Sequence, residues 1–140
     1  MIPRIIHYCW FGRGEKPKLA KKCIYSWKKY MPNCEIIEWN EDNFDVNMIP
    51  YTKEAYEKGK YAFVSDFARF YILNKYGGIY MDVDVELIKP LDYLLNNKVF
   101  LGFEKKGRVG PGLIMGSEPN TLFLKDMIEI YSDLHFINSD

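Results

Sequence analysis

The sequence predicts an α/β domain, because strand-like and helix-like segments alternate along its 140 residues. The first expected strand, residues 2–11, is almost continuously apolar and aromatic, as in strands that are covered on both faces. The longest expected helix, residues 62–76, is apolar on nearly every side, which is typical of a buried helix. An apolar content of 48% and an aromatic content of 16% supply a core for a single domain.

The other elements are expected where β-rich runs or helical apolar stripes are bounded by turn residues. The expected strands are 35–39, 78–85, 99–104 and 113–115, and the expected helices are 17–30, 52–58 and 120–134. We expect the strand that begins at Gly78 to continue past two aspartates until Pro90 breaks it. The acidic segment 40–45 and the glycine-rich run 107–112 are predicted to be loops, and the second matches no phosphate-loop pattern.

Helix 17–30 is expected to be amphipathic. Its apolar stripe comprises Leu19, Cys23, Trp27 and Tyr30, and the lysines at 18, 21, 22, 28 and 29 lie opposite. We expect this lysine-rich side to be solvated, with weak attraction to an anionic membrane or an acidic acceptor as the alternative.

Composition argues against several classes of function. The formal net charge is zero and no basic cluster dominates, so we expect no nucleic-acid partner. No stretch approaches the ~20 apolar residues that span a bilayer, and no signal-peptide pattern follows Arg4. Cys9, Cys23 and Cys34 lack metal-site spacing, and their odd number indicates reduced thiols. We therefore expect a cytoplasmic protein, with the inner face of the membrane as the alternative location.

Three polar residues interrupt the first half of helix 62–76. Asp66 and Arg69 are three residues apart and Ser65 and Arg69 are four apart, so they share a face of the helix. Burying charges is costly unless they are paired or line a polar cavity. Either Asp66 and Arg69 form an internal ion pair with Ser65 as a helix cap, or these side chains point into a ligand cleft.

Two aspartates interrupt the buried strand that follows. The Gly77-Gly78 pair is expected to end the helix, and the strand then carries Asp82 and Asp84. Because strand side chains alternate, both carboxylates should project to one side if the strand stays extended. Mg²⁺ and Mn²⁺ prefer carboxylate oxygen and compensate the repulsion between the two groups. The pair therefore predicts a divalent-metal site.

Together these motifs resemble a known enzyme family. The run Ser65-Asp66-x-x-Arg69, followed by Gly77-Gly78-Ile79-Tyr80-x-Asp82-x-Asp84, is similar to the sugar-binding DxD region of nucleotide-sugar glycosyltransferases, most closely the family-32 type. That type includes bacterial capsular and lipooligosaccharide transferases and the yeast initiating mannosyltransferase, and the glucosylating clostridial toxins share its core. Residues 5–12 resemble its opening strand, so the resemblance covers roughly residues 2–123.

The resemblance implies a GT-A type fold, which is a Rossmann-like α/β sandwich with a mixed, mostly parallel central sheet. It implies that Asp84 ligates the Mn²⁺ or Mg²⁺ ion that holds the donor diphosphate. Asp82 would contact the donor ribose and the metal shell. Asp66 and Arg69 would contact the donor sugar and are the predicted catalytic residues.

Three further residues complete the donor site that the resemblance implies, namely Trp10, Ser65 and Tyr80. Trp10 would line the nucleobase pocket, and its place at the carboxyl end of a strand suits base stacking, although a core role is the alternative. His7 in the same strand is expected to be a hydrogen-bonded core residue rather than a base. Family members are thought to transfer with retention of anomeric configuration.

The chemistry of these side chains fits glycosyl transfer. A nucleoside diphosphate leaves with developing negative charge, which a metal at Asp84 and a cation such as Arg69 would stabilise. A carboxylate such as Asp66 would bind sugar hydroxyls or stabilise an oxocarbenium-like centre.

We expect one nucleotide-sugar-binding glycosyltransferase domain, residues 1–140, that lacks the C-terminal acceptor part. The expected donor is a UDP-sugar and the expected acceptor is a glycan or glycolipid in cell-surface polysaccharide or glycolipid assembly. Neither His135 nor Asp140 lies in a recognisable motif, so a third metal ligand is not identified. A shortened sheet has open edges, which favour self-association.

Two other functions stay open at this point. One is a non-catalytic nucleotide-sugar-binding scaffold, and metal-dependent donor hydrolysis would distinguish it from an enzyme. The other is a DxD metal phosphotransferase or nucleotidyltransferase, against which the lack of a glycine-rich phosphate loop with a lysine argues.

Overall fold

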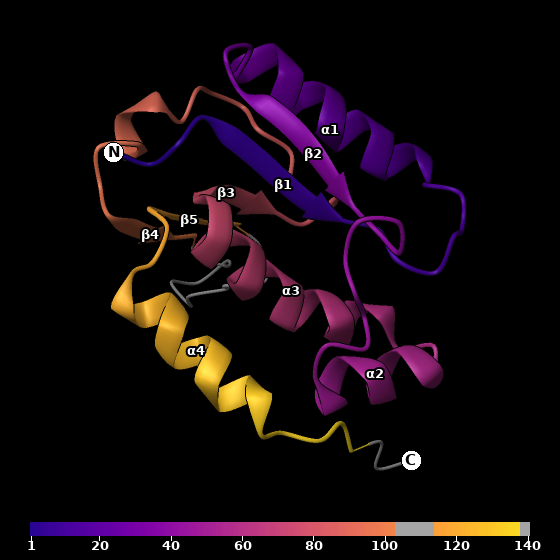
Figure 1. The fold of residues 1–140 in the computed structure, drawn as a ribbon. Coiled ribbons are helices and arrows are strands. Elements are labelled where there is room, and N and C mark those ends of the chain that lie inside the picture. Colours follow the sequence, from indigo (N-terminus) through magenta and orange to yellow (C-terminus); the bar gives the residue numbers. More distant parts are fainter. Residues whose placement is uncertain (103–113, 138–140) are drawn as a thin grey trace.

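The computed structural model describes residues 1–102 and 114–137. Its strands are β1 (Ile5–Cys9), β2 (Glu35–Trp39), β3 (Gly78–Met81), β4 (Val99–Leu101) and β5 (Ile114–Ser117). Its helices are α1 (Lys18–Tyr30), α2 (Pro50–Glu57), α3 (Tyr61–Tyr76) and α4 (Leu122–Ser132), with a short 3-10 turn at Asp92–Leu94. The alternation of strands and helices confirms the predicted α/β class (Figure 1).

The described strands form one mixed sheet in the order β2-β1-β3-β5-β4. Strand β1 pairs in parallel with both β2 and β3, whereas β5 runs antiparallel to β3 and to β4. All of these strands except β5 therefore share one direction, as expected for a mostly parallel sheet. Strands β2 and β4 form the two edges, and self-association through them stays a prediction.

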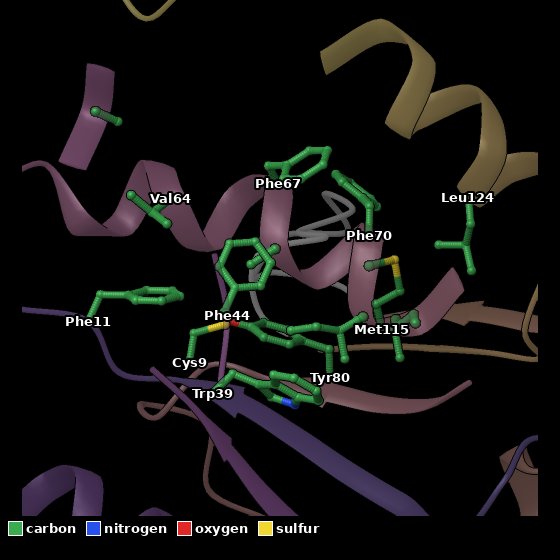
Figure 2. Packing of buried hydrophobic residues seen from close by; sticks show 14 of the residues in the cluster. Cys9, Phe11, Trp39, Phe44, Val64, Phe67, Phe70, Tyr80, Met115 and Leu124 are labelled. Carbon is green, nitrogen blue, oxygen red and sulfur yellow. The ribbon is translucent and has the colours of Figure 1, made fainter. Parts of the chain in front are cut away.

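Helices cover both faces of the sheet, with α1 on one face and α2, α3 and α4 on the other (Figure 1). Side chains alternate between these layers, so Ile79 and Met81 pack toward α1 while Tyr80 packs toward α3. Figure 2 shows Phe67 and Phe70 of α3 above Tyr80, with Trp39 beneath it. The first strand is thus covered on both faces, as its apolar sequence predicts.

The glycine pair ends α3 at Tyr76, as predicted. Gly77 has φ +68° and ψ 178°, a combination outside the left-handed helical region and essentially restricted to glycine. Gly78 allows a close approach, because a Cβ atom there would lie 2.5 Å from the carbonyl oxygen of Ile5. The turn therefore brings the end of α3 directly against β1.

The prediction that β3 continues past its aspartates is wrong. The strand ends at Met81, the last residue paired with β5, and a turn follows in which Val85 N–H donates to the Asp82 carbonyl at 3.0 Å. The later residues cover α1 instead, since the Val85 carbonyl accepts from Trp27 Nε1 at 2.7 Å and Leu87 N–H donates to Ser26 Oγ at 2.9 Å. No neighbouring strand in the described sheet pairs beyond Met81, so the extended conformation has no ladder there.

Other bounds differ by smaller amounts. Helix α2 begins at Pro50, where proline is compatible with a first helical position. Leu19 is 56% exposed rather than part of the apolar stripe, because α1 faces the sheet with Ala20, Cys23 and Trp27. Gly102 does not extend β4. The predicted strand residues 103 and 104 and the predicted loop 107–112 lie outside the described residues. None of the described helices is long and apolar enough to cross a bilayer.

Candidate functional site

A cleft of about 600 Å³ lies where β1 and β3 end and α3 begins. Its position matches the rule that open α/β sheets bind ligands beyond the carboxyl ends of parallel strands. All of the predicted donor-binding residues line it: Trp10, Ser65, Asp66, Arg69, Tyr80, Asp82 and Asp84. The cleft therefore unites motifs that are more than 50 residues apart in the sequence.

Asp66 and Arg69 form an ion pair within this cleft. Arg69 Nη2 lies 2.5 Å from Asp66 Oδ1, and Arg69 Nε donates to the Ser65 carbonyl at 3.2 Å. The arginine is buried and its guanidinium lies 5.2 Å from the centre of the Tyr80 ring. Asp66 and Arg69 therefore form the internal ion pair and also line the cleft, so the two interpretations offered for these residues are compatible.

The expected helix cap at Ser65 is wrong. Helix α3 begins at Tyr61, so Ser65 lies inside its second turn, and its hydroxyl donates to the Tyr61 carbonyl at 3.4 Å. The N-terminal residues of α3 receive no side-chain cap from Lys60. Ser65 is thereby placed on the wall of the cleft, one turn before Arg69.

Burial shapes the electrostatics of the aspartates. Desolvation raises the pKa of Asp82 to about 6, although Arg69 and a hydrogen bond from the Tyr80 hydroxyl at 3.2 Å oppose this shift. The neighbouring carboxylates of Asp84 and Asp66 raise the Asp82 pKa further. Burial also raises the pKa of Asp66, and Arg69 partly offsets that effect. The cleft thus holds three carboxylates beside one guanidinium.

The residues at the end of β3 fit a divalent cation. Asp82 is half-buried and Asp84 is exposed, and the turn that replaces the predicted strand leaves both on the cleft. A hard cation would relieve the repulsion between them. Among the described residues no group of three or more His, Cys, Asp or Glu side chains could hold a metal. A Mg²⁺-like ion that is bound by two carboxylates takes its other ligands from substrate phosphates and water.

Trp10 and His7 have different roles in β1 and the residues after it. Trp10 is half-buried on the cleft, and its indole Nε1 donates to the Gly14 carbonyl at 2.8 Å, which holds the ring in the cleft wall. His7 is fully buried, its Nε2 lies 2.9 Å from the Gly77 carbonyl, and its Nδ1 accepts from Trp39 Nε1 at 3.0 Å. His7 is therefore the hydrogen-bonded core residue that we expect.

Some cleft residues escaped the sequence interpretation, notably Gly12 and Tyr61. Gly12 has φ +95°, and a Cβ atom there would lie 2.4 Å from the Tyr61 ring, so the two form a close-packed wall. Glu41 stabilises this wall, because its carboxylate accepts from Gly12 N–H at 2.5 Å and from the Tyr56 hydroxyl at 2.8 Å. Two features of the sequence could have indicated this wall, namely the acidic loop 40–45 and an aromatic residue just before the predicted helix 62–76.

The chain is similar to proteins that are described as glycosyltransferases. Residues 17–101 match the family model "Glycosyltransferase sugar-binding region containing DXD motif". The chain is 35% identical over 133 residues to an uncharacterized glycosyltransferase of Acanthamoeba polyphaga mimivirus, with 86% of this chain and 51% of that protein covered. It is 30% identical over 111 residues to inositol phosphoceramide mannosyltransferase 1 of Schizosaccharomyces pombe, with 71% and 33% covered.

A solved structure shares the fold. The PaToxG glycosyltransferase superposes with a TM-score of 0.75 at 19% identity, over 91% of this chain and 59% of that one. At this identity the likeness concerns the fold, and it confirms the predicted GT-A type arrangement. The chain spans about half of the viral relative and about a third of the yeast relative.

Proposed function

Because the chain belongs to the family of glycosyltransferases whose sugar-binding region contains a DXD motif, we propose that it acts on a nucleotide-sugar donor and transfers the sugar to a glycan or glycolipid acceptor. The observation that carries this proposal is the convergence of Asp66, Arg69, Asp82 and Asp84 on one cleft beyond the sheet. A guanidinium beside several carboxylates suits a ligand that has both a diphosphate and sugar hydroxyls.

Asp84 and Asp82 would hold a divalent cation, Mn²⁺ or Mg²⁺, together with the donor diphosphate. When bound, such a cation supplies Lewis-acid stabilisation of the departing diphosphate. Arg69 places its positive charge on the same cleft, where it stabilises negative charge that develops on the leaving group. Its position is held by Asp66, by the Ser65 carbonyl and by the Tyr80 ring, so little reorganisation is needed during reaction.

The donor sugar and base would lie on either side of this charged centre. Asp66 accepts hydrogen bonds from sugar hydroxyls or stabilises an oxocarbenium-like sugar, with retention of configuration as the resemblance implies. The half-buried Trp10 ring offers a face on which the nucleobase stacks. Ser65 adds a hydroxyl beside the sugar position.

The donor base and the acceptor are the finer parts of the proposal. We propose a UDP-sugar as donor, with a mannose donor as the alternative because the yeast relative is named as a mannosyltransferase. That relative's name also specifies inositol phosphoceramide, which favours a glycolipid over a soluble glycan as the acceptor. A location in the cytoplasm, close to a membrane, agrees with such an acceptor.

The test is calorimetric titration with UDP, GDP, CDP and ATP, each with and without Mn²⁺, followed by an assay of metal-dependent donor hydrolysis. We expect one nucleoside diphosphate to bind only with Mn²⁺, and Asp84→Asn to abolish that binding. Asp126→Asn on the exposed side of α4 is the matched control, since it removes one carboxylate from a residue that does not line the cleft.

Three outcomes would contradict the proposal in different ways. If the folded protein binds none of these nucleotides, it has no working donor site. Binding of a nucleoside diphosphate without any donor hydrolysis would favour a binding scaffold. A preference for ATP over every sugar diphosphate would favour phosphotransfer or nucleotidyl transfer.

A further inference from the structure

The outward side of α1 carries a concentrated positive charge. We call the exposed residues Lys18, Lys21, Lys22, Lys28 and Lys29 the lysine face, and α1 contains no acidic residue. The opposite side of the helix packs on the sheet through Ala20, Cys23 and Trp27. Helix α1 is therefore held to the sheet by apolar contacts, and the lysine face points away from the protein.

Few carboxylates neutralise this face. Among the described residues, those within 4 Å of its ammonium groups are Glu15, 3.8 Å from Lys21, and Glu86, 3.7 Å from Lys22. Both pairs are exposed, and pairs of that kind contribute little. The chain has 19 basic and 19 acidic residues, so five lysines on α1 leave the remainder with an excess of acidic residues. The lysine face of α1 is thus a positively charged surface.

Exposed apolar side chains lie on this face and beside α1. Tyr25 lies in the middle of the lysine face and is 69% exposed. Ile88 is 80% exposed and follows Leu87, whose N–H donates to Ser26 Oγ of α1. Lysines around protruding tyrosine and aliphatic side chains are typical of surfaces that meet lipid headgroups, where the ammonium groups contact phosphates and the apolar groups enter the interface.

We propose that the lysine face, together with Tyr25 and Ile88, binds the surface of membranes that contain anionic lipids. A protein partner fits less well, because lysine is depleted from the cores of protein interfaces. A fluid layer of anionic headgroups accepts mobile lysines without a fixed geometry.

The lysine face lies close to the cleft, so membrane contact through this face would matter for the proposed function. Lys22 lies near Glu86, and Glu86 is two residues beyond Asp84. In the same segment, the Val85 carbonyl accepts a hydrogen bond from Trp27 Nε1. The face therefore adjoins the turn that carries the candidate metal ligands. The benefit of membrane docking rests on the proposed function, since docking would hold the cleft beside glycolipid acceptors. The lipid contact itself needs neither donor nor metal.

The test is co-sedimentation of the chain with two kinds of vesicle, one of phosphatidylcholine alone and one of phosphatidylcholine with about 30 mol% phosphatidylglycerol. The anionic lipid gives the second kind a negative surface potential, which attracts basic segments. We expect binding only to the anionic vesicles. Binding should fall steeply with salt, since the Debye length shrinks from about 10 Å at 0.1 M to about 3 Å at 1 M.

A pair of matched triple variants locates the contact. Lys18→Gln, Lys28→Gln and Lys29→Gln together should weaken binding about 100-fold, from about 1 kcal/mol per lysine near an anionic surface. The control combines Lys53→Gln in α2 with Lys58→Gln and Lys60→Gln in the connection between α2 and α3. It removes the same charge from exposed positions on the opposite face of the sheet and should leave binding unchanged. Tyr25→Ser, at an exposed position, should weaken binding several-fold because the ring enters the interface, and an unchanged affinity would remove Tyr25 from the binding surface.

Equal binding to neutral vesicles, an unchanged affinity in the lysine-face variant, or an equal loss in the control would each overturn the proposal. Circular dichroism of each variant verifies that the fold is kept. Because the vesicle assay contains no nucleotide, a failure here leaves the nucleotide titration unaffected, and a failed titration leaves the vesicle result unaffected.

Discussion

His7 lies within β1 and Asp82 lies just beyond the end of β3, and the surroundings of these two ionisable groups differ completely. His7 is fully buried, and both ring nitrogens have hydrogen-bond partners in Gly77 and Trp39. Burial lowers the pKa of His7, so the ring stays neutral. Asp82 is half-buried, receives a hydrogen bond from Tyr80, and has a pKa raised to about 6 beside other carboxylates.

The comparison shows that a polar group next to the same apolar sheet can support the fold at one position and belong to a candidate binding site at another. A buried polar group whose hydrogen bonds are complete contributes to stability, and its removal leaves partners unsatisfied. A cluster of carboxylates whose desolvation is only partly compensated is poised to bind a cation. Changes around His7 should therefore affect folding, whereas changes around Asp82 should affect ligand binding.

The largest effect is expected at Asp84. Asp84→Asn should lower metal-dependent donor turnover by more than about 100-fold, because under the proposed function it removes a direct metal ligand rather than an outer contact. Its melting temperature should stay close to that of the parent, since the side chain is exposed. Donor hydrolysis at saturating Mn²⁺ and a thermal melt measure the two quantities. Turnover at the parent level would remove Asp84 from the metal site.

Arg69→Lys should reduce donor turnover by about tenfold or more. Lysine keeps the charge but not the planar fork that contacts both the Asp66 carboxylate and the Ser65 carbonyl. Turnover of Arg69→Lys and Arg69→Ala is compared, with urea unfolding of both. If Arg69→Ala unfolds the protein and Arg69→Lys retains full turnover, the pair with Asp66 is structural.

His7→Gln should destabilise the protein by about 1–3 kcal/mol, the usual cost of leaving a buried polar partner unsatisfied, while nucleotide binding is retained. The parent should also lose more stability than His7→Gln as the pH falls below about 6.5, because the unfolded chain then binds a proton that folded His7, with its lowered pKa, resists. Urea unfolding at a series of pH values measures both effects. His135→Gln, at an exposed histidine, is the control. An equally steep acid loss in His7→Gln would assign the pH dependence elsewhere.

The smallest effect is expected at Tyr80. Tyr80→Phe removes the 3.2 Å hydrogen bond to Asp82 and should weaken Mn²⁺ affinity a few-fold, in keeping with about 1 kcal/mol for a single bond. Calorimetry with Mn²⁺ and the preferred nucleoside diphosphate measures it. Tyr93→Phe, at an exposed tyrosine, should have no effect. A loss as large as that of Asp84→Asn would mean that Tyr80 contacts the donor directly.

The sequence could single out the residues of the candidate site because they are unusual for their positions. Charges at Asp66, Arg69, Asp82 and Asp84 stand out against apolar runs, and the structure places all four on one cleft, while their roles in donor and metal binding stay predictions. Asp82 and Asp84 nonetheless reach it for a different reason from the one predicted. They lie on a turn rather than on an extended strand.

That difference has a physical cause in sheet pairing. Strand β3 can remain extended only where neighbours supply a ladder, and its partner β5 lies more than 30 residues later in the chain. Leu19 illustrates the same point, since the helical pattern permits it on the buried stripe but the observed packing uses Ala20.

By itself, the sequence determined the alternation of strands and helices, the end of α3 at a glycine pair, and the identity of the charged residues in the cleft. These features depend on backbone preferences and on side-chain periodicity within a few neighbouring residues. Only the tertiary structure decided that Asp82 begins a turn, that Tyr61 packs on Gly12, and that His7 bonds to Trp39 and Gly77. Those features depend on contacts between distant segments, which local preferences do not encode.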